Sequence, residues 1–125
     1  MIEYLLIFLG CGLGGMARHF VSDRAFIWWG PSFPYGTILA NVTGSFLMGL
    51  IAIILINKFQ QLEPQLRALL LVGFLGGYTT FSSFSIATLN LFESGDILKA
   101  IANIVLSVLL CILAAWVGVV LGKQI

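Results

Sequence analysis

The chain has 125 residues, of which 60% are hydrophobic and only 9% are charged, and its formal net charge at pH 7 is +1. Ordinary soluble domains carry far more charge, so this composition predicts a single small membrane domain over residues 1–125. A net charge near zero argues against nucleic acid as a partner. The sequence shows no nucleophile–base pair, metal-ligand spacing or cofactor-binding loop, which argues against an enzyme.

Four apolar segments follow one another along the chain, at residues 2–22, 36–56, 66–92 and 97–121. About 20 helical residues cross a bilayer core, so each segment is long enough to span it. Backbone groups at membrane depth must be hydrogen-bonded within the chain, which favours helices. We therefore predict an all-α membrane protein with four transmembrane helices.

The first segment ends close to basic and aromatic residues. Arg18 lies toward its end, where the side chain could snorkel to lipid headgroups or draw anions into a vestibule. The connection that follows, residues 23–35, carries Trp28, Trp29 and Tyr35. Such an aromatic cluster is typical of the membrane–water interface.

The second and fourth segments each carry a stripe of polar residues four positions apart: Thr37, Asn41 and Ser45 in one, and Asn103, Ser107 and Cys111 in the other. Residues at this spacing share one helix face. One interpretation is interhelical hydrogen bonding, worth about 0.6 kcal/mol for each bond. The other is a hydrogen-bonding track for a small polar solute, which the presence of two stripes favours.

The centre of the third segment, Gly76-Gly77-Tyr78-Thr79-Thr80, is a poor helix former because it combines glycine with β-branched threonine. We expect the helix to break there. A break would leave mid-membrane carbonyl groups that could surround a Na⁺ ion. The alternative is a glycine kink whose threonine hydroxyls bond back to the preceding turn; the sequence alone does not separate the two.

Beyond this centre, Phe81 and Phe84 share a helix face, with Ser82 and Ser85 beside them. Aromatic residues at helical spacing usually serve packing. An aromatic ring also has a positive edge, and two such edges beside hydroxyl groups could hold an anion weakly enough to release it.

The basic residues divide evenly between the two membrane faces. One face receives Lys58, Arg67 and Lys123, and the other receives Arg18, Arg24 and Lys99. The positive-inside rule therefore gives no preferred direction, which indicates insertion in both orientations and an antiparallel two-fold homodimer. A single orientation set by the insertion machinery or by a partner is the alternative.

The run from Gly76 to Ser85 resembles the third-helix signature of the small bacterial fluoride channels, the Fluc or CrcB family. The spacing of Gly10, Gly12, Gly14 and Arg18 and the second-segment pattern from Pro34 to Gly44 resemble the same family. The resemblance implies a dual-topology homodimer in the bacterial plasma (inner) membrane, surrounded by lipid, that passively exports cytoplasmic fluoride and lowers its toxicity.

The resemblance also assigns site residues. It implies that the backbone carbonyls of Gly76 and Thr79 hold a structural Na⁺ that is not transported. It places the fluoride pathway along Arg18, Asn41, Thr80, Phe81, Ser82, Phe84, Ser85, Asn103 and Ser107. Two departures from the family pattern are visible: Ala87 and Thr88 stand near where a carboxylate is common, and Asn103 or Ser107 stands where an aromatic residue or histidine is common.

Two rival functions remain. A small dual-topology, proton-coupled multidrug exporter would need a titratable group within the bundle. The acidic residues lie near the terminus or in connections, so His19 is the one remaining candidate for that group. A non-transporting membrane subunit would use its polar stripes only to bind partner helices. In that case, changing Asn41 or Phe81 would disturb assembly before transport.

Overall fold

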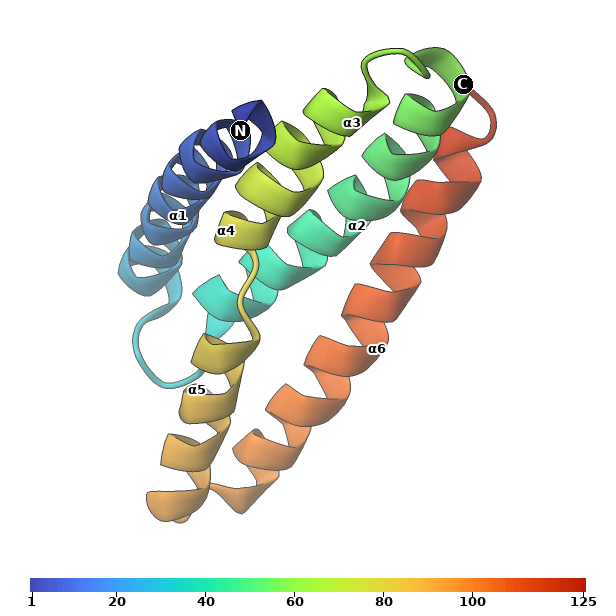
Figure 1. The fold of residues 1–125 in the computed structure, drawn as a ribbon. Coiled ribbons are helices and arrows are strands. Elements are labelled where there is room, and N and C mark those ends of the chain that lie inside the picture. Colours follow the sequence, from blue (N-terminus) through green and yellow to red (C-terminus); the bar gives the residue numbers. More distant parts are fainter.

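The computed structural model describes residues 1–125 and contains helices and no strands (Figure 1). The helices are α1 (Ile2–Trp29), α2 (Tyr35–Lys58), α3 (Glu63–Leu66), the π-helical η1 (Arg67–Leu75), α4 (Gly76–Tyr78), α5 (Phe81–Glu93) and α6 (Ile97–Gly122). Four stretches are long and apolar enough to cross a membrane: Ile2–Trp29, Tyr35–Lys58, Glu63–Glu93 and Ile97–Gly122. The all-helical class and the four spans are thus confirmed.

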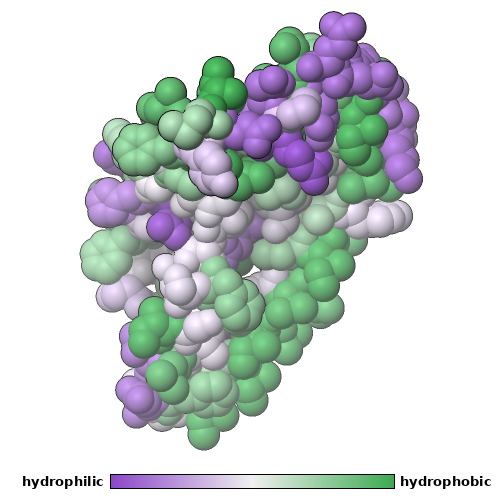
Figure 2. Space-filling model, viewed as in Figure 1, coloured by the Kyte–Doolittle hydropathy of each residue, from purple (hydrophilic) through white to green (hydrophobic).

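Both termini and the α2–α3 connection lie at one end of the bundle, and the other two connections lie toward the opposite end (Figure 1). Helix α2 packs chiefly against α6, and α1 packs chiefly against η1. Most large apolar side chains face outward, as lipid-exposed helices require. In Figure 2, hydrophobic residues run along α6, and hydrophilic residues gather at the end that carries the termini.

The end of the first helix was predicted wrongly. We expected it to end at Ser22, but α1 continues to Trp29. The charged residues after Ser22 do not stop a helix; His19 Nε2 lies 3.4 Å from the Asp23 carboxylate, one turn away. The helix ends where Gly30 adopts a φ of 77° and donates its N–H to the Phe26 carbonyl at 2.8 Å. The aromatic pair Trp28–Trp29 therefore lies on the last helical turn.

The third span contains a short non-helical segment. Thr79 has a ψ of 156° and Thr80 a φ of −156°, so both residues are extended between α4 and α5. Helix α5 starts with a side-chain cap, because the Ser83 N–H donates to Thr80 Oγ1 at 3.2 Å. The residues before it, Gly76 and Gly77, contribute low helix propensity to the same region.

Glycines allow the helices to touch backbone to backbone. A Cβ atom added at Gly118 of α6 would collide with the Phe46 carbonyl oxygen of α2, and one added at Gly14 of α1 would collide with the Phe74 carbonyl oxygen. In contrast, a Cβ at Gly15 would meet no atom within 4 Å. Small residues thus set the separation of the helices, as is common in membrane bundles.

We predict that Gly118→Ala lowers the free energy of unfolding by about 1–3 kcal/mol, because the added methyl group forces α2 and α6 apart. Denaturant unfolding of the purified protein in detergent measures the change. Gly15→Ala is the matched control and should leave stability unchanged or slightly raised. Equal effects of the two substitutions would contradict the close α2–α6 contact.

Candidate functional site

The extended segment of the third span is held by one side chain of α2. Asn41 Oδ1 accepts a hydrogen bond from the Thr80 N–H at 2.7 Å, and Asn41 Nδ2 donates to the Thr80 carbonyl at 3.0 Å. The carboxamide thereby pairs with both backbone groups of a residue that belongs to neither helix. One of the two Nδ2 hydrogens remains outside this pairing.

These bonds release two carbonyl groups from helical pairing. In a continuous α-helix the Thr80 N–H would donate to the Gly76 carbonyl, and the Ser83 N–H would donate to the Thr79 carbonyl. Here Asn41 Oδ1 takes the first N–H and Thr80 Oγ1 takes the second. The carbonyls of Gly76 and Thr79 therefore lose their α-helical donors, and both have oxygen atoms of the type that hard cations prefer.

No group of three His, Cys, Asp or Glu side chains lies close enough to hold a metal ion. Gly76 is exposed on the surface of the chain, and a Cβ there would meet only the Leu71 carbonyl oxygen, at 3.8 Å. Its backbone is therefore open to a neighbouring molecule. The donor set for an alkali-metal ion at this place would consist of carbonyl oxygens.

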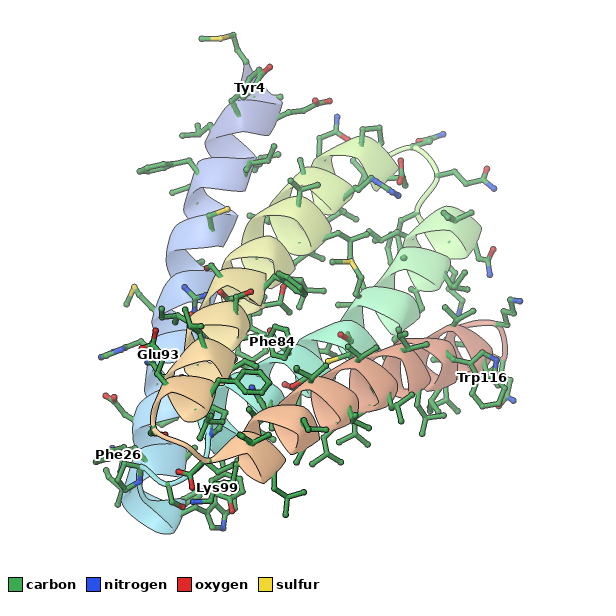
Figure 3. The ribbon with its side chains drawn as sticks, turned by 90° about the horizontal axis from the view of Figure 1, so that it is seen from below. Tyr4, Phe26, Phe84, Glu93, Lys99 and Trp116 are labelled. Atoms are coloured by element: carbon green, nitrogen blue, oxygen red, sulfur yellow. The ribbon has the colours of Figure 1, made fainter.

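The two phenylalanines form a pair with unequal exposure. The ring centroids of Phe81 and Phe84 are 5.2 Å apart, and the ring planes are inclined by 51°. Phe84 lies on the inner side of α5, toward α2 and α6 (Figure 3). It is 9% exposed, whereas Phe81 is 77% exposed. One ring thus packs within the bundle, and the other projects from it.

The hydroxyl groups around the pair differ in their partners. Ser82 Oγ lies 3.1 Å from Thr80 Oγ1, so these two side chains form one polar group at the start of α5. Ser85 Oγ donates to the Phe81 carbonyl at 2.9 Å, within its own helix. Both serines are exposed.

The fourth-helix stripe is a buried hydrogen-bonded chain. Ser107 Oγ donates to Asn103 Oδ1 at 3.3 Å, and Asn103 Nδ2 donates to Thr88 Oγ1 at 2.8 Å. Thr88 Oγ1 in turn donates to the Phe84 carbonyl at 2.8 Å. This link between α5 and α6 was not predicted from the sequence, in which Thr88 stood out only as a departure from a family pattern. Its position one turn after Phe84 was the available signal.

A cavity of about 290 Å³ gathers part of the predicted site. Its lining residues come from α2, the extended segment, α5 and α6: Asn41, Gly44, Ser45, Met48, Thr79, Thr80, Phe81 and Ala115. A larger cavity of about 580 Å³ lies at the end formed by the 30–36 connection and the end of α5, with Thr37, Asn90 and Asp96 among its lining residues. Arg18 is half-buried on α1 and, like Asn103 and Ser107, lines neither of these two cavities.

Comparison with known proteins assigns the chain to a family. The family model described as "CrcB-like protein, Camphor Resistance (CrcB)" matches residues 5–119. The chain belongs to the CrcB-like family. The resemblance inferred from the third-span signature is thereby confirmed.

Three curated relatives of this chain share one name. A protein of Coxiella burnetii (strain Dugway 5J108-111) called "Fluoride-specific ion channel FluC" is 53% identical over 99% of this chain and 100% of its own length. Proteins with the same name from Methylococcus capsulatus and Hydrogenovibrio crunogenus are 51% and 44% identical over 99% of this chain, covering 54% and 93% of their own lengths. Family and fold together identify a multi-pass membrane protein.

We predict that Thr88→Val lowers the free energy of unfolding by about 1–3 kcal/mol, because the Asn103 amide, 1% exposed, loses its acceptor. Thermal unfolding in detergent measures the change. Thr88→Ser keeps the hydroxyl group and should lie close to the wild type. If Val and Ser variants are equally stable, the buried chain of hydrogen bonds does not stabilise the α5–α6 contact.

Proposed function

We propose that this chain is a fluoride-selective ion channel that lets fluoride leave the cytoplasm passively through the bacterial plasma membrane. The observation that carries the proposal is the relative named "Fluoride-specific ion channel FluC", 53% identical over 99% of the chain. A passive pore suffices for export, because the membrane potential drives an anion outward. Lower cytoplasmic fluoride is the expected benefit to the cell.

The cavity beside the extended segment supports the pathway. Fluoride is small and strongly hydrated, so a pore must replace its water with closely placed donors. The remaining Nδ2 hydrogen of Asn41 and the ring edge of Phe81 belong to residues that line this cavity. The Thr80 hydroxyl also belongs to the lining; it donates to Ser83 Oγ at 3.3 Å and would turn from it to an arriving anion. Ser82 and Phe84 extend the same polar and aromatic group through their contacts with Thr80 and Phe81. Ring edges attract an anion without trapping it.

The fourth-helix residues and Arg18 have a different place in the proposal. Ser107 bonds to Asn103, and Asn103 bonds to Thr88, so both would contribute to a polar wall and hold α5, with the second Nδ2 hydrogen of Asn103 as the remaining donor of the pair. Ser85 would act beside Phe81, and Arg18 would draw anions toward the membrane face.

We further propose an antiparallel homodimer. The even division of basic residues supports insertion in both orientations. Phe81, 77% exposed, and the exposed Gly76 would need a neighbour to enclose them. A second copy in the opposite orientation supplies the same surfaces across a two-fold axis.

A structural Na⁺ would sit at the centre of this dimer, held by the Gly76 and Thr79 carbonyls of both copies. The loss of the helical donors of these two carbonyls supports the assignment. The ion would supply fixed positive charge at the break, and it would not cross the membrane.

We predict that liposomes holding the purified chain alone lose fluoride rapidly and retain chloride, when a potassium ionophore balances the charge. Ion-selective electrodes measure both losses. Liposomes without protein are the control for leakage. Fluoride loss that requires a pH gradient would favour the proton-coupled exporter, and no loss from folded protein in Na⁺ would overturn the channel.

We predict that each membrane face displays both ends of the helical bundle, one from each orientation of the chain. Ser94 and Gln124 lie at opposite ends of the bundle, and each is changed to Cys in a Cys11→Ala/Cys111→Ala background. In intact cells, an impermeant maleimide should label about half of the molecules at each of the two reporter cysteines. Adding Gln60→Lys and Gln61→Lys should raise the labelled fraction of one reporter and lower that of the other. Full labelling of one reporter and none of the other before that change would refute dual topology.

A further inference from the structure

One turn of α2 contacts three successive residues of the third span, and this arrangement goes beyond the pore role expected for Asn41. We propose that Gly44 and Thr43 are positioning residues: they set the backbone of Tyr78 and Thr79, and with it the direction of the Thr79 carbonyl. The inference rests on the proposed channel and its Na⁺ site. In this proposal, α2 determines the backbone conformation of the extended segment.

Gly44 provides the space that Thr79 occupies. Gly44 is buried, and a Cβ atom there would collide with Thr79 Cγ2 and lie 3.1 Å from Tyr78 Cδ1. The methyl group cannot rotate away freely, because Thr79 Oγ1 donates to the Leu75 carbonyl at 2.8 Å. The Thr79 N–H donates to the same carbonyl at 2.9 Å, so backbone and side chain are fixed together. A β-branched side chain has few other rotamers.

Thr43 fixes the preceding residue. Its hydroxyl lies 2.7 Å from the Leu39 carbonyl and 2.9 Å from the Tyr78 hydroxyl. A hydroxyl has one hydrogen, and a carbonyl can only accept, so Thr43 donates to Leu39 and Tyr78 donates to Thr43. The Tyr78 ring also stacks on Phe74 with a centroid distance of 6.0 Å and an interplanar angle of 9°. Tyr78 is therefore held at its ring and at its hydroxyl.

The three contacts act on consecutive residues. Thr43 holds Tyr78, Gly44 accommodates Thr79, and Asn41 pairs with Thr80. A binding site works only when its groups are held within about 0.5 Å of their productive positions. A shift of Thr79 away from an added Cβ would therefore move its carbonyl out of place while leaving most of the bundle intact.

The test compares Gly44→Ala with Gly49→Ala, a second buried glycine of α2. A Cβ at Gly49 would collide with the Ala115 carbonyl oxygen of α6, whereas one at Gly44 meets Tyr78 and Thr79. Ala115 lines the same cavity, so the Na⁺ response rather than the flux is the deciding readout for this control. Fluoride loss from liposomes is one readout, and the Na⁺ concentration that gives half of the Na⁺-induced rise in melting temperature is the other. We expect Gly44→Ala to lower fluoride flux and raise this Na⁺ concentration, each roughly tenfold or more. Gly49→Ala should lower the melting temperature with the half-point for Na⁺ unchanged.

Thr79→Ser supplies a rescue, because it removes Cγ2 and keeps the hydroxyl that bonds to Leu75. The Gly44→Ala/Thr79→Ser double variant should come within about threefold of Thr79→Ser alone in flux and in Na⁺ half-point. If Gly44→Ala does not fold, Tyr78→Phe and Thr43→Val carry the test. Each should raise the Na⁺ half-point, and the Thr43→Val/Tyr78→Phe double variant should raise it no more than either single change. Thr43→Ser should restore the wild-type value.

Gly44 is a packing residue only, and the proposal falls, if Gly44→Ala and Gly49→Ala behave alike or if Thr79→Ser gives no rescue. The channel and the inference fail separately. A wild type that is stabilised by Na⁺ but passes no fluoride would overturn the channel, and the Na⁺ half-points would still decide the role of Gly44. A wild type that passes fluoride without being stabilised by Na⁺ would remove the Na⁺ ion from the proposal. The rescue of fluoride flux by Thr79→Ser would then decide the role of Gly44. A wild type with neither property overturns both.

Discussion

A backbone that leaves the helical conformation inside a membrane must find partners for its N–H and C=O groups, since lipid offers none. In this chain one carboxamide meets that requirement: Asn41 pairs with both backbone groups of Thr80. An unpaired buried group costs about 1–3 kcal/mol, so the extended segment depends on this contact for its stability. The cavity beside it, the start of α5 and the position of Phe81 all follow from where Thr80 is held.

The same contact explains how polar groups become available to an ion. Asn41 Oδ1 and Thr80 Oγ1 take two N–H donors, and the carbonyls of Gly76 and Thr79 are left without them. Other polar side chains form hydrogen bonds within the bundle. Ser85 and Thr88 donate to carbonyls of their own helix, and the Asn103 amide bonds to Thr88. Polar residues in the spans thus divide into those that hold the bundle and those near the break that retain free hydrogen-bonding capacity.

Sequence reasoning predicted the four spans, because long apolar segments have one stable arrangement in lipid. It placed the end of the first helix too early, since charged residues mark the edge of a membrane but do not end a helix; Gly30 does. It placed Asn41 and Asn103 in polar stripes, yet periodicity within one helix cannot name a partner on another. The Thr80 backbone and the Thr88 hydroxyl are such partners, and only the packing of α2 and α6 brings them within reach.

The double use of Asn41 has a consequence for how an anion is selected. Its Oδ1 and one Nδ2 hydrogen are committed to Thr80, so the remaining hydrogen points in a fixed direction set by the backbone it clamps. A donor fixed in this way cannot retreat to suit a larger ion, and the favourable distance for a small anion is kept. Flexible side chains would adapt to chloride as well as to fluoride. Selectivity in the proposed pore would then come from rigidity, and that rigidity would come from the same hydrogen bonds that make the interruption of the third span stable.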